Sequence, residues 1–273
     1  MISGAALRKG ADVMEIVEPK VFLVGETRMV EEGLEAYLEH VGAPDWSTDA
    51  PSEAEKLCEV YGRLCYRSFA PGLNPNVTRV RKGNDSYLGH ILEVGHGSVL
   101  EHAVVNFIFA DVSRVFTHEL VRHRAGTAIS QESLRYVRLG TLSAYVPMHI
   151  REHEQGMEIF CKTVEQLEQV QKELAEAFAI EDETAFSTKK QLTSAFRRVA
   201  PLGLATTVGW SCNFRGLRHV IEIRTAPDAE EELRLVFGKV YEAVKDRYPN
   251  LFGDYTVENV DGLPWIKTAH RKV

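Results

Sequence analysis

The chain has 273 residues, a hydrophobic content of 44% and a formal net charge of −7 at pH 7. This hydrophobic content can fill a core, and the acidic balance argues against a general binder of nucleic acid or of anionic membrane surfaces. The four cysteines lack paired spacing, no run approaches the ~18 apolar residues of a membrane span, and the first twenty residues lack a signal peptide's apolar centre. We therefore expect a cytoplasmic protein with reduced thiols.

The predicted organisation is a weakly ordered leader at residues 1–19, followed by a single domain at residues 20–273. Ser52 and Glu55 form a capping-box pattern, which predicts a helix start. In the first half, apolar runs and helical spacing predict a strand at 20–25, a helix at 29–41, a helix after Ser52 with Leu57, Tyr61, Leu64 and Cys65 inward, a loop at 71–85, a helix at 87–95 and a strand at 103–110.

The second half is predicted to be mostly helical. Asn213 stands where an N-cap is expected, and the segment from Thr225 has Pro and Asp in what reads as a first helical turn. The patterns predict helices at 155–180 and 182–199, a strand at 204–212, a helix after Asn213, a last helix from Thr225 to Tyr248 and a loop from Gly253 onward.

One short segment, residues 122–136, gathers three arginines and a histidine within an acidic chain. Guanidinium groups present paired donors that match phosphate and carboxylate oxygens, so the segment favours an anionic ligand. Ser113 predicts a helix start and Gly126 its end, and the alternation at 134–139 predicts a strand. The competing interpretation, a solvated face or a subunit salt-bridge seam, is favoured by roughly four to one for an arbitrary Arg-x-Arg.

Two further segments carry polar groups that pattern alone does not assign to a site. Residues 95–102 join a predicted helix to a predicted strand, and a Gly-His-Gly there indicates a turn with a stray histidine. Residues 213–224 place Arg215 and His219 one helical turn apart on one face. By itself, that spacing is most typical of a solvated amphipathic helix.

No metal site is predicted. His118 and His123 frame a Glu-containing segment, but they are five residues apart, about 140° around a helix, whereas a helical zinc pair needs a spacing of four. His149 and His153 have that spacing but lack a nearby third ligand.

Taken together, these segments resemble the flavin-dependent thymidylate synthases. Arg122-His123-Arg124, then eight residues, then Ser133 and Arg135-Tyr136 resemble the family signature, with one residue more than is usual within 125–129. Residues 95–102 resemble a second family motif, Gly-His-x-Ser/Thr-x-x-Glu-His. Residues 213–224 resemble a third, Asn-x-Arg-x-Leu-x-His/Asn followed by Arg. The resemblance covers roughly residues 21–248, and the order of the blocks makes it specific.

The resemblance implies the fold and the reaction. Members are α+β proteins with a sheet flanked by helices, and they form homotetramers with active sites shared between chains. They convert dUMP to dTMP, take the carbon from 5,10-methylenetetrahydrofolate and take a hydride from FAD that NADPH has reduced. No cysteine nucleophile is used, and none of the four cysteines here has a base and a cationic neighbour. By the same resemblance, residues 20–273 are expected to form one catalytic domain.

The resemblance also implies roles for single residues. The implied catalytic residues are Arg224, beside the uracil, and His96, beside the flavin and the folate. The implied flavin contacts are Ser98, Glu101, Arg122, His123, Arg124, Ala125, Asn213, Phe214, Arg215 and His219. The implied dUMP contacts are Glu119, Arg122, Gln131, Ser133, Arg135, Arg197 and Arg224. Glu119 stands where many members have Gln, and a carboxylate at that position cannot donate a hydrogen bond.

Two other functions remain open from the residues alone. A non-enzymatic protein could hold a nucleotide with the same arginines as a regulatory ligand, and it would neither take up flavin nor oxidise NADPH. If the arginines instead form a subunit interface without a ligand, Arg135→Ala would change assembly without changing nucleotide affinity.

Overall fold

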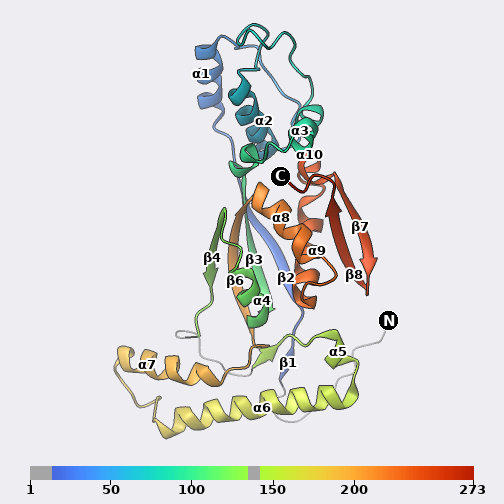
Figure 1. Cartoon of the computed structure of the whole chain (residues 1–273). Coiled ribbons are helices and arrows are strands. Elements are labelled where there is room, and N and C mark those ends of the chain that lie inside the picture. The colour runs from blue at the N-terminus through green and yellow to red at the C-terminus, as the bar shows by residue number, and fades with distance from the viewer. Residues whose placement is uncertain (1–13, 135–141) are drawn as a thin grey trace. The chain divides into compact units, whose positions relative to one another are not determined.

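The computed structural model describes residues 14–134 and 142–273 and mixes helices with strands, as expected for an α+β chain (Figure 1). The chain divides into two compact units. One takes in the described residues of Met1–Lys20, Ala110–Leu120 and Gln131–Val208, and the other takes in Val21–Phe109, Val121–Ser130 and Gly209–Val273. Among the described residues, no helix is both long enough and apolar enough to span a membrane. The prediction of one catalytic domain at 20–273 stays a prediction.

The largest sheet has four strands in the order β2-β3-β6-β4. Its strands are β2 (Lys20–Glu26), β3 (Val104–Ser113), β6 (Ala205–Asn213) and β4 (Thr127–Gln131). Burial alternates strictly along β6, as expected for a strand with one face on a core. The strands predicted at 20–25, 103–110 and 204–212 are therefore confirmed.

The unit that contains Val21–Phe109 holds an aromatic core on one face of the sheet. The Trp210 ring lies 5.8 Å from the Phe109 ring and 5.7 Å from the Phe237 ring of α9, centroid to centroid. Its helices are α1 (Glu31–Val41), α2 (Glu53–Tyr66), α3 (Asn84–Glu93), η1 (Gly97–Glu101), α8 (Phe214–Arg224), α9 (Glu231–Val244) and α10 (Pro249–Phe252). Helices α8 and α9 pack against each other and against the last strand, β8.

The C-terminal segment is a hairpin, so the loop predicted from Gly253 onward is wrong. Strands β7 (Tyr255–Val260) and β8 (Leu263–Thr268) pair antiparallel. Asp261 and Gly262 form the turn with φ of +55° and +79°, and Asp-Gly is the signature of the turn that matches strand twist. The last long helix also starts later than predicted, because the Glu230 carboxylate accepts from the backbone N–H groups of Glu232 and Leu233 and caps α9.

Helix α2 begins at the predicted cap, where Ser52 Oγ accepts from the Glu55 backbone N–H. Its predicted inward face is wrong, because Leu64 and Cys65 are exposed. The buried face instead carries charge. Arg63 donates from Nε and Nη2 to Glu59 Oε1 at 2.8 and 2.6 Å, and Asn84 Nδ2 donates to Glu59 Oε2 at 2.7 Å. Burial of these groups is tolerated because each charge meets its opposite.

The unit that contains Gln131–Val208 is mainly helical. Its elements are β1 (Glu15–Ile16), α4 (Arg114–Leu120), β5 (Ser143–Ala144), α5 (Met148–Arg151), α6 (Glu154–Ala177), α7 (Phe186–Phe196) and η2 (Arg197–Val199). The two long helices predicted at 155–180 and 182–199 are confirmed in kind, the second being shorter. β1 pairs parallel with β5, and Met14 is buried in the cluster beneath them. Residues 14–19 of the expected leader therefore belong to the fold.

We predict that Arg63→Ala lowers the free energy of unfolding by about 3–5 kcal/mol, because it leaves the Glu59 carboxylate buried and without its cation. The control is Lys56→Ala on the same helix, whose partner Glu31 is half exposed. A surface pair of that kind contributes about 0–1 kcal/mol. Urea unfolding of the two variants measures both values. Equal, small losses would contradict the role given to the buried pair.

Candidate functional site

The Arg122-His123-Arg124 segment lies in a turn and not at the end of a helix. Ser113 Oγ accepts from the Phe116 backbone N–H, as predicted for a cap, but the helix that it starts ends at Leu120, well before the predicted end at Gly126. The residues after Leu120 are mostly exposed, so no apolar stripe remains to hold them as a helix. The following strand, β4, begins at Thr127. Most of the strand predicted at 134–139 lies outside the described residues.

This turn is fastened to the junction between β6 and α8. The Asn213 backbone N–H donates to the Gly126 carbonyl at 2.9 Å. The Asn213 side-chain Oδ1 accepts from the Gly216 backbone N–H at 2.8 Å, which confirms the predicted N-cap. Gly126 has φ of +66°, and a Cβ there would lie 2.1 Å from Asn213 Nδ2. The arginine turn can approach α8 this closely only because position 126 has no side chain.

A hydrogen bond joins the turn to the end of α8. Arg224 Nε donates to His123 Nε2 at 2.7 Å, and Thr127 Oγ1 donates to the His123 carbonyl at 2.7 Å. Since a guanidinium group only donates, His123 Nε2 must accept, and the ring proton of the neutral imidazole is then on Nδ1. Arg122 and Arg124 on either side are exposed. The turn therefore presents two guanidinium groups and an oriented imidazole.

The 95–102 segment meets the same helix. Arg215 Nη1 pairs with Glu101 Oε1 at 2.6 Å, with both side chains about half exposed. A Cβ on Gly97 would lie 2.6 Å from Arg215 Nε, so Arg215 crosses directly over η1. An exposed pair adds at most about 1 kcal/mol of stability. Its main effect here is to hold the Arg215 side chain over η1. Ser98 and His219 are exposed on η1 and α8.

Two predicted flavin contacts are held mainly through backbone. Phe214 has a fully buried side chain, 4.7 Å from the Tyr248 ring, and its backbone N–H donates to the Ala103 carbonyl at 3.0 Å. Ala125 is exposed, and its carbonyl lies against Gly216, where a Cβ would come within 3.2 Å. All ten predicted flavin contacts and both predicted catalytic residues thus belong to the unit that contains Gly209–Val273.

His96 has a partner that the sequence did not suggest. The Tyr66 hydroxyl lies 2.6 Å from His96 Nδ1, and the two rings stack with centroids 5.5 Å apart. Tyr66 is the last residue of α2, thirty positions upstream of His96. No local motif marks it, because only the fold brings the end of α2 beside η1.

The predicted dUMP contacts Glu119, Gln131, Ser133 and Arg197 lie in the other unit, and Arg135 lies outside the described residues. Gln131 Nε2 donates to Thr117 Oγ1 at 3.2 Å. Arg114, which the sequence analysis missed, belongs with this group. Burial lowers the pKa of Arg114, Glu132 opposes that shift, and the positive charge of Arg197 adds to it. The positive charges of Arg114 and Arg197 are thus near enough to influence each other.

The cysteines do not form a nucleophile site. Cys58 and Cys212 are fully buried, and burial raises the pKa of both thiols, so neither is a thiolate near neutral pH. Cys65 is exposed and Cys161 is half-buried. In the described ranges 14–134 and 142–273, no three His, Cys, Asp or Glu side chains are grouped to hold a metal ion.

Known proteins match most of the chain. Residues 48–250 match the family described as "Thymidylate synthase complementing protein". The flavin-dependent thymidylate synthase of Corynebacterium efficiens is 37% identical over 218 residues, which are 79% of this chain and 84% of that protein. The corresponding protein of Mycobacteroides abscessus is 34% identical over 221 residues, 78% of this chain and 84% of the relative.

A solved structure matches the fold. The UMP/dUMP methylase PolB of Streptomyces cacaoi, bound with 5-Br UMP, superposes with a TM-score of 0.62 at 16% sequence identity. The match covers 88% of this chain and 95% of that one. At this identity the likeness concerns the fold alone.

The contact between Gly126 and Asn213 makes a matched prediction possible. Gly126→Ala should lower the free energy of unfolding by about 3 kcal/mol, from about 1–2 for a left-handed alanine and the rest from overpacking. Gly72→Ala is the control, because Gly72 has φ of +84° but nothing within 4 Å of the added Cβ, and it should cost only about 1–2 kcal/mol. Urea unfolding compares them. Equal costs would mean that the Asn213 contact does not constrain the turn.

Proposed function

This chain belongs to the flavin-dependent thymidylate synthase family, and on that premise we propose how its residues divide the reaction. The chain is an FAD-dependent methyltransferase that converts dUMP to dTMP, with 5,10-methylenetetrahydrofolate and NADPH as co-substrates. The observation that carries the proposal is the hydrogen bond from Arg224 to His123. This bond connects Arg224, which is proposed to contact the uracil, with His123, which is proposed to contact the flavin.

The residues around the turn suit an anionic dinucleotide. Arg122 and Arg124 expose guanidinium groups beside the backbone of the 124–126 turn, and Arg215 is held across η1 by Glu101. Planar donor forks of this kind bind diphosphate oxygens in pairs. We assign the FAD diphosphate and flavin contacts to these residues, together with Ser98, His123, Ala125, Asn213, Phe214 and His219. When bound, FAD supplies the hydride.

Arg224 is assigned to the uracil ring. Methylation at C5 requires electron density at that carbon, and a guanidinium group stays charged at any working pH, so it can stabilise negative charge that develops on the ring. Its Nε–H is committed to His123, which fixes the plane of the guanidinium. His123 in turn holds its own proton on Nδ1 and presents it as a donor. His96, oriented by Tyr66, is assigned to the flavin and folate.

The remaining substrate contacts are assigned to charged and amide groups. Arg114 and Arg197 suit the phosphate of dUMP, since an anion between them would relieve their repulsion. Gln131, Ser133, Arg135 and Arg122 are assigned to the nucleotide as well. Glu119 is an acceptor only, so it is assigned to an N–H group and not to a carbonyl.

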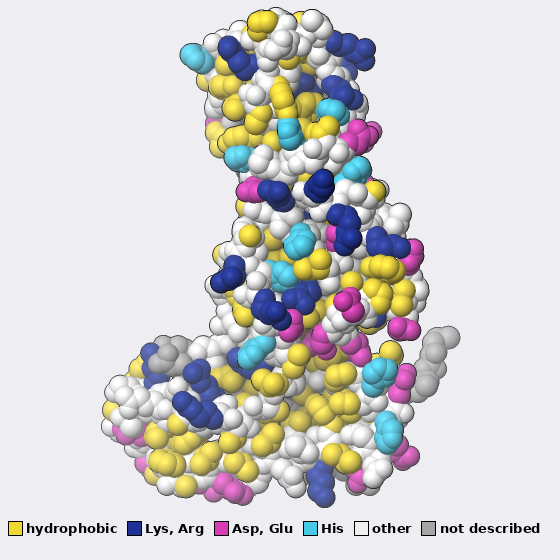
Figure 2. All heavy atoms as spheres, in the orientation of Figure 1, with side chains coloured by type: hydrophobic (Ala, Val, Ile, Leu, Met, Phe, Trp, Pro, Cys, Tyr) yellow, Lys and Arg dark blue, Asp and Glu magenta, His cyan; other side chains and the backbone are white. Residues whose placement is uncertain are grey.

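We also propose a homotetramer that works in the cytoplasm. Large apolar side chains are exposed on α6 and α7 and at the residue that caps the end of α6 (Figure 2). Ile159, Phe186 and Phe178 have 59%, 68% and 56% of their surface accessible. Exposed apolar side chains that gather on one surface are typical of an association surface. The four cysteines are free thiols, which suits a reducing compartment.

Loss of the Arg224 guanidinium is expected to separate catalysis from cofactor binding. Arg224→Ala should reduce thymidylate formation by about a hundredfold to a thousandfold, the loss typical of removing one donor at a developing anion, while FAD affinity changes little. The control Lys245→Ala removes a surface cation that pairs with Glu242 and should keep full activity. Product formation and FAD fluorescence titration give the two readouts. Undiminished turnover in Arg224→Ala would remove its assigned role.

Assembly gives an independent prediction. Light scattering of the purified protein should give four times the chain mass of 30.7 kDa. Phe186→Ser, which places a hydroxyl on an exposed apolar site, should shift the mass toward smaller species if α7 lies in an interface. A monomeric mass for the unsubstituted protein would refute the homotetramer.

A further inference from the structure

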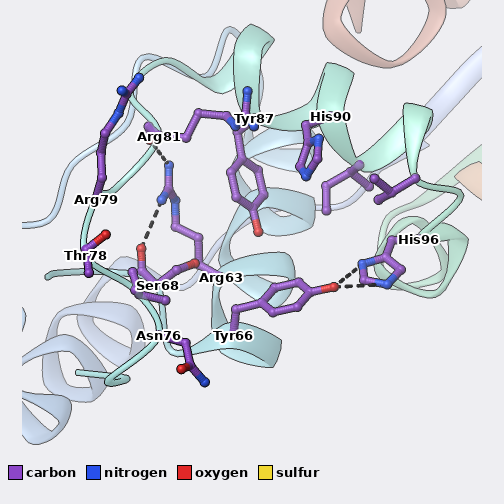
Figure 3. Close-up of a pocket in the computed structure, with 13 residues that line it drawn as sticks. Arg63, Tyr66, Ser68, Asn76, Thr78, Arg79, Arg81, Tyr87, His90 and His96 are labelled. Atoms are coloured by element: carbon purple, nitrogen blue, oxygen red, sulfur yellow. Dashed lines mark hydrogen bonds between the residues drawn. The ribbon is translucent and has the colours of Figure 1, made fainter. Parts of the chain in front are cut away.

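A pocket of ≈ 300 Å³ opens between α2, α3 and the connection that joins them (Figure 3). Its charged and imidazole groups are Arg63, Arg79, Arg81, His90 and His96, and no Asp or Glu lines it. In a chain with a net charge of −7, a concave site without a carboxylate is a local reversal of charge. Such a site attracts anions.

Two of these arginines are available for a ligand. Arg79 and Arg81 are exposed, and neither pairs with an acidic side chain in the described part of the chain. In Figure 3, Arg79 and Thr78 lie on one side of the pocket, and His90 and His96 lie on the other side. Arg79 thus stands across the pocket from the ring of His96, which the proposed function places beside the flavin and the folate.

The loop that carries these arginines is held in shape by buried groups. Arg63, only 2% exposed, donates from Nη1 to the Ser68 carbonyl at 3.1 Å and from Nη2 to the Arg81 carbonyl at 2.8 Å. It also lies over the Tyr87 ring at 4.4 Å. The two ends of the loop are therefore clamped to one side chain of α2. A pre-organised loop lowers the entropy cost of binding a ligand.

We propose that this pocket binds the anionic tail of a co-substrate whose ring lies at His96. The chemistry is that of a carboxylate or phosphate group received by the guanidinium groups of Arg79 and Arg81. It could come from the glutamate tail of methylenetetrahydrofolate or from the 2′-phosphate of NADPH. The pocket volume suits a fragment with one charged group and is at the lower limit for a whole small ligand. This inference rests on the proposed function of His96.

The test compares two neighbouring cations. Arg81→Ala removes a side chain that lines the pocket but keeps the carbonyl that Arg63 clamps. Lys82→Ala removes an exposed cation one residue away that does not line it. Both variants lose one positive charge, so a difference between them reports the pocket and not the general field. Unfolding midpoints of the two should match that of the unsubstituted protein, since both sites are exposed.

Binding is measured on the oxidised, FAD-loaded protein, which requires no turnover. The first arm titrates methylenetetrahydrofolate with one and with three glutamates. The second arm titrates NADP+ and NAD+, which differ by the 2′-phosphate and cannot reduce the oxidised FAD. A lost charge-assisted hydrogen bond should raise the Kd of the responsible ligand about tenfold in Arg81→Ala, equal to about 1.4 kcal/mol. The Arg79→Ala/Arg81→Ala double variant should raise it further.

Each outcome either supports or overturns the proposal that the pocket binds an anionic group. A larger Kd for the triglutamate assigns the carboxylate, and loss of the preference for NADP+ over NAD+ assigns the phosphate; either supports the pocket. Changes below about twofold in both arms, equal changes in Lys82→Ala, or a loss confined to FAD affinity would overturn it. Failure of the unsubstituted protein to form thymidylate would instead overturn the proposed function and leave these binding results standing.

Discussion

The contact between Gly126 and Asn213 is the constraint on which the candidate site depends. Asn213 ends β6, caps α8 with its side chain and donates its backbone N–H to Gly126. One residue therefore sets the start of the helix that carries Arg215 and Arg224 and the position of the turn that carries the arginines. Because Gly126 has no Cβ, the turn comes close enough for His123 to accept from Arg224. The geometry of the turn follows from packing as much as from charge.

A second constraint is the buried charge on α2. Glu59 and Arg63 are about as buried as core leucines, which would cost several kcal/mol if either lost its partner. In return, Arg63 clamps both ends of the loop that follows α2, and α2 ends at Tyr66 beside His96. The buried pair and the Asn213 cap thus have similar roles. In each, a polar group with its hydrogen bonds formed positions the side chains proposed to contact a ligand.

The features that the sequence predicted well are those fixed by local rules. The caps at Ser52, Ser113 and Asn213 depend on side chains within three residues, and all three form as predicted. The errors come from distant contacts. The face of α2 was misassigned because Glu59 and Arg63 resemble a solvated i,i+4 pair until the fold brings Asn84 and the Arg81 carbonyl to them. Tyr66 and Arg114 carry no motif. The β7–β8 hairpin is predictable from the sequence, because Asp261-Gly262 is a hairpin turn signal. The family comparison favours an enzyme over a non-enzymatic nucleotide-binding protein.

The most direct test of the account follows the flavin and the product together without oxygen. The FAD-loaded protein is reduced with NADPH, and then dUMP and methylenetetrahydrofolate are added. The account predicts that the visible absorbance of oxidised FAD returns as thymidylate forms, in equal amounts. A protein that binds dUMP but neither takes up FAD nor forms thymidylate would contradict the account and would indicate a nucleotide-binding protein.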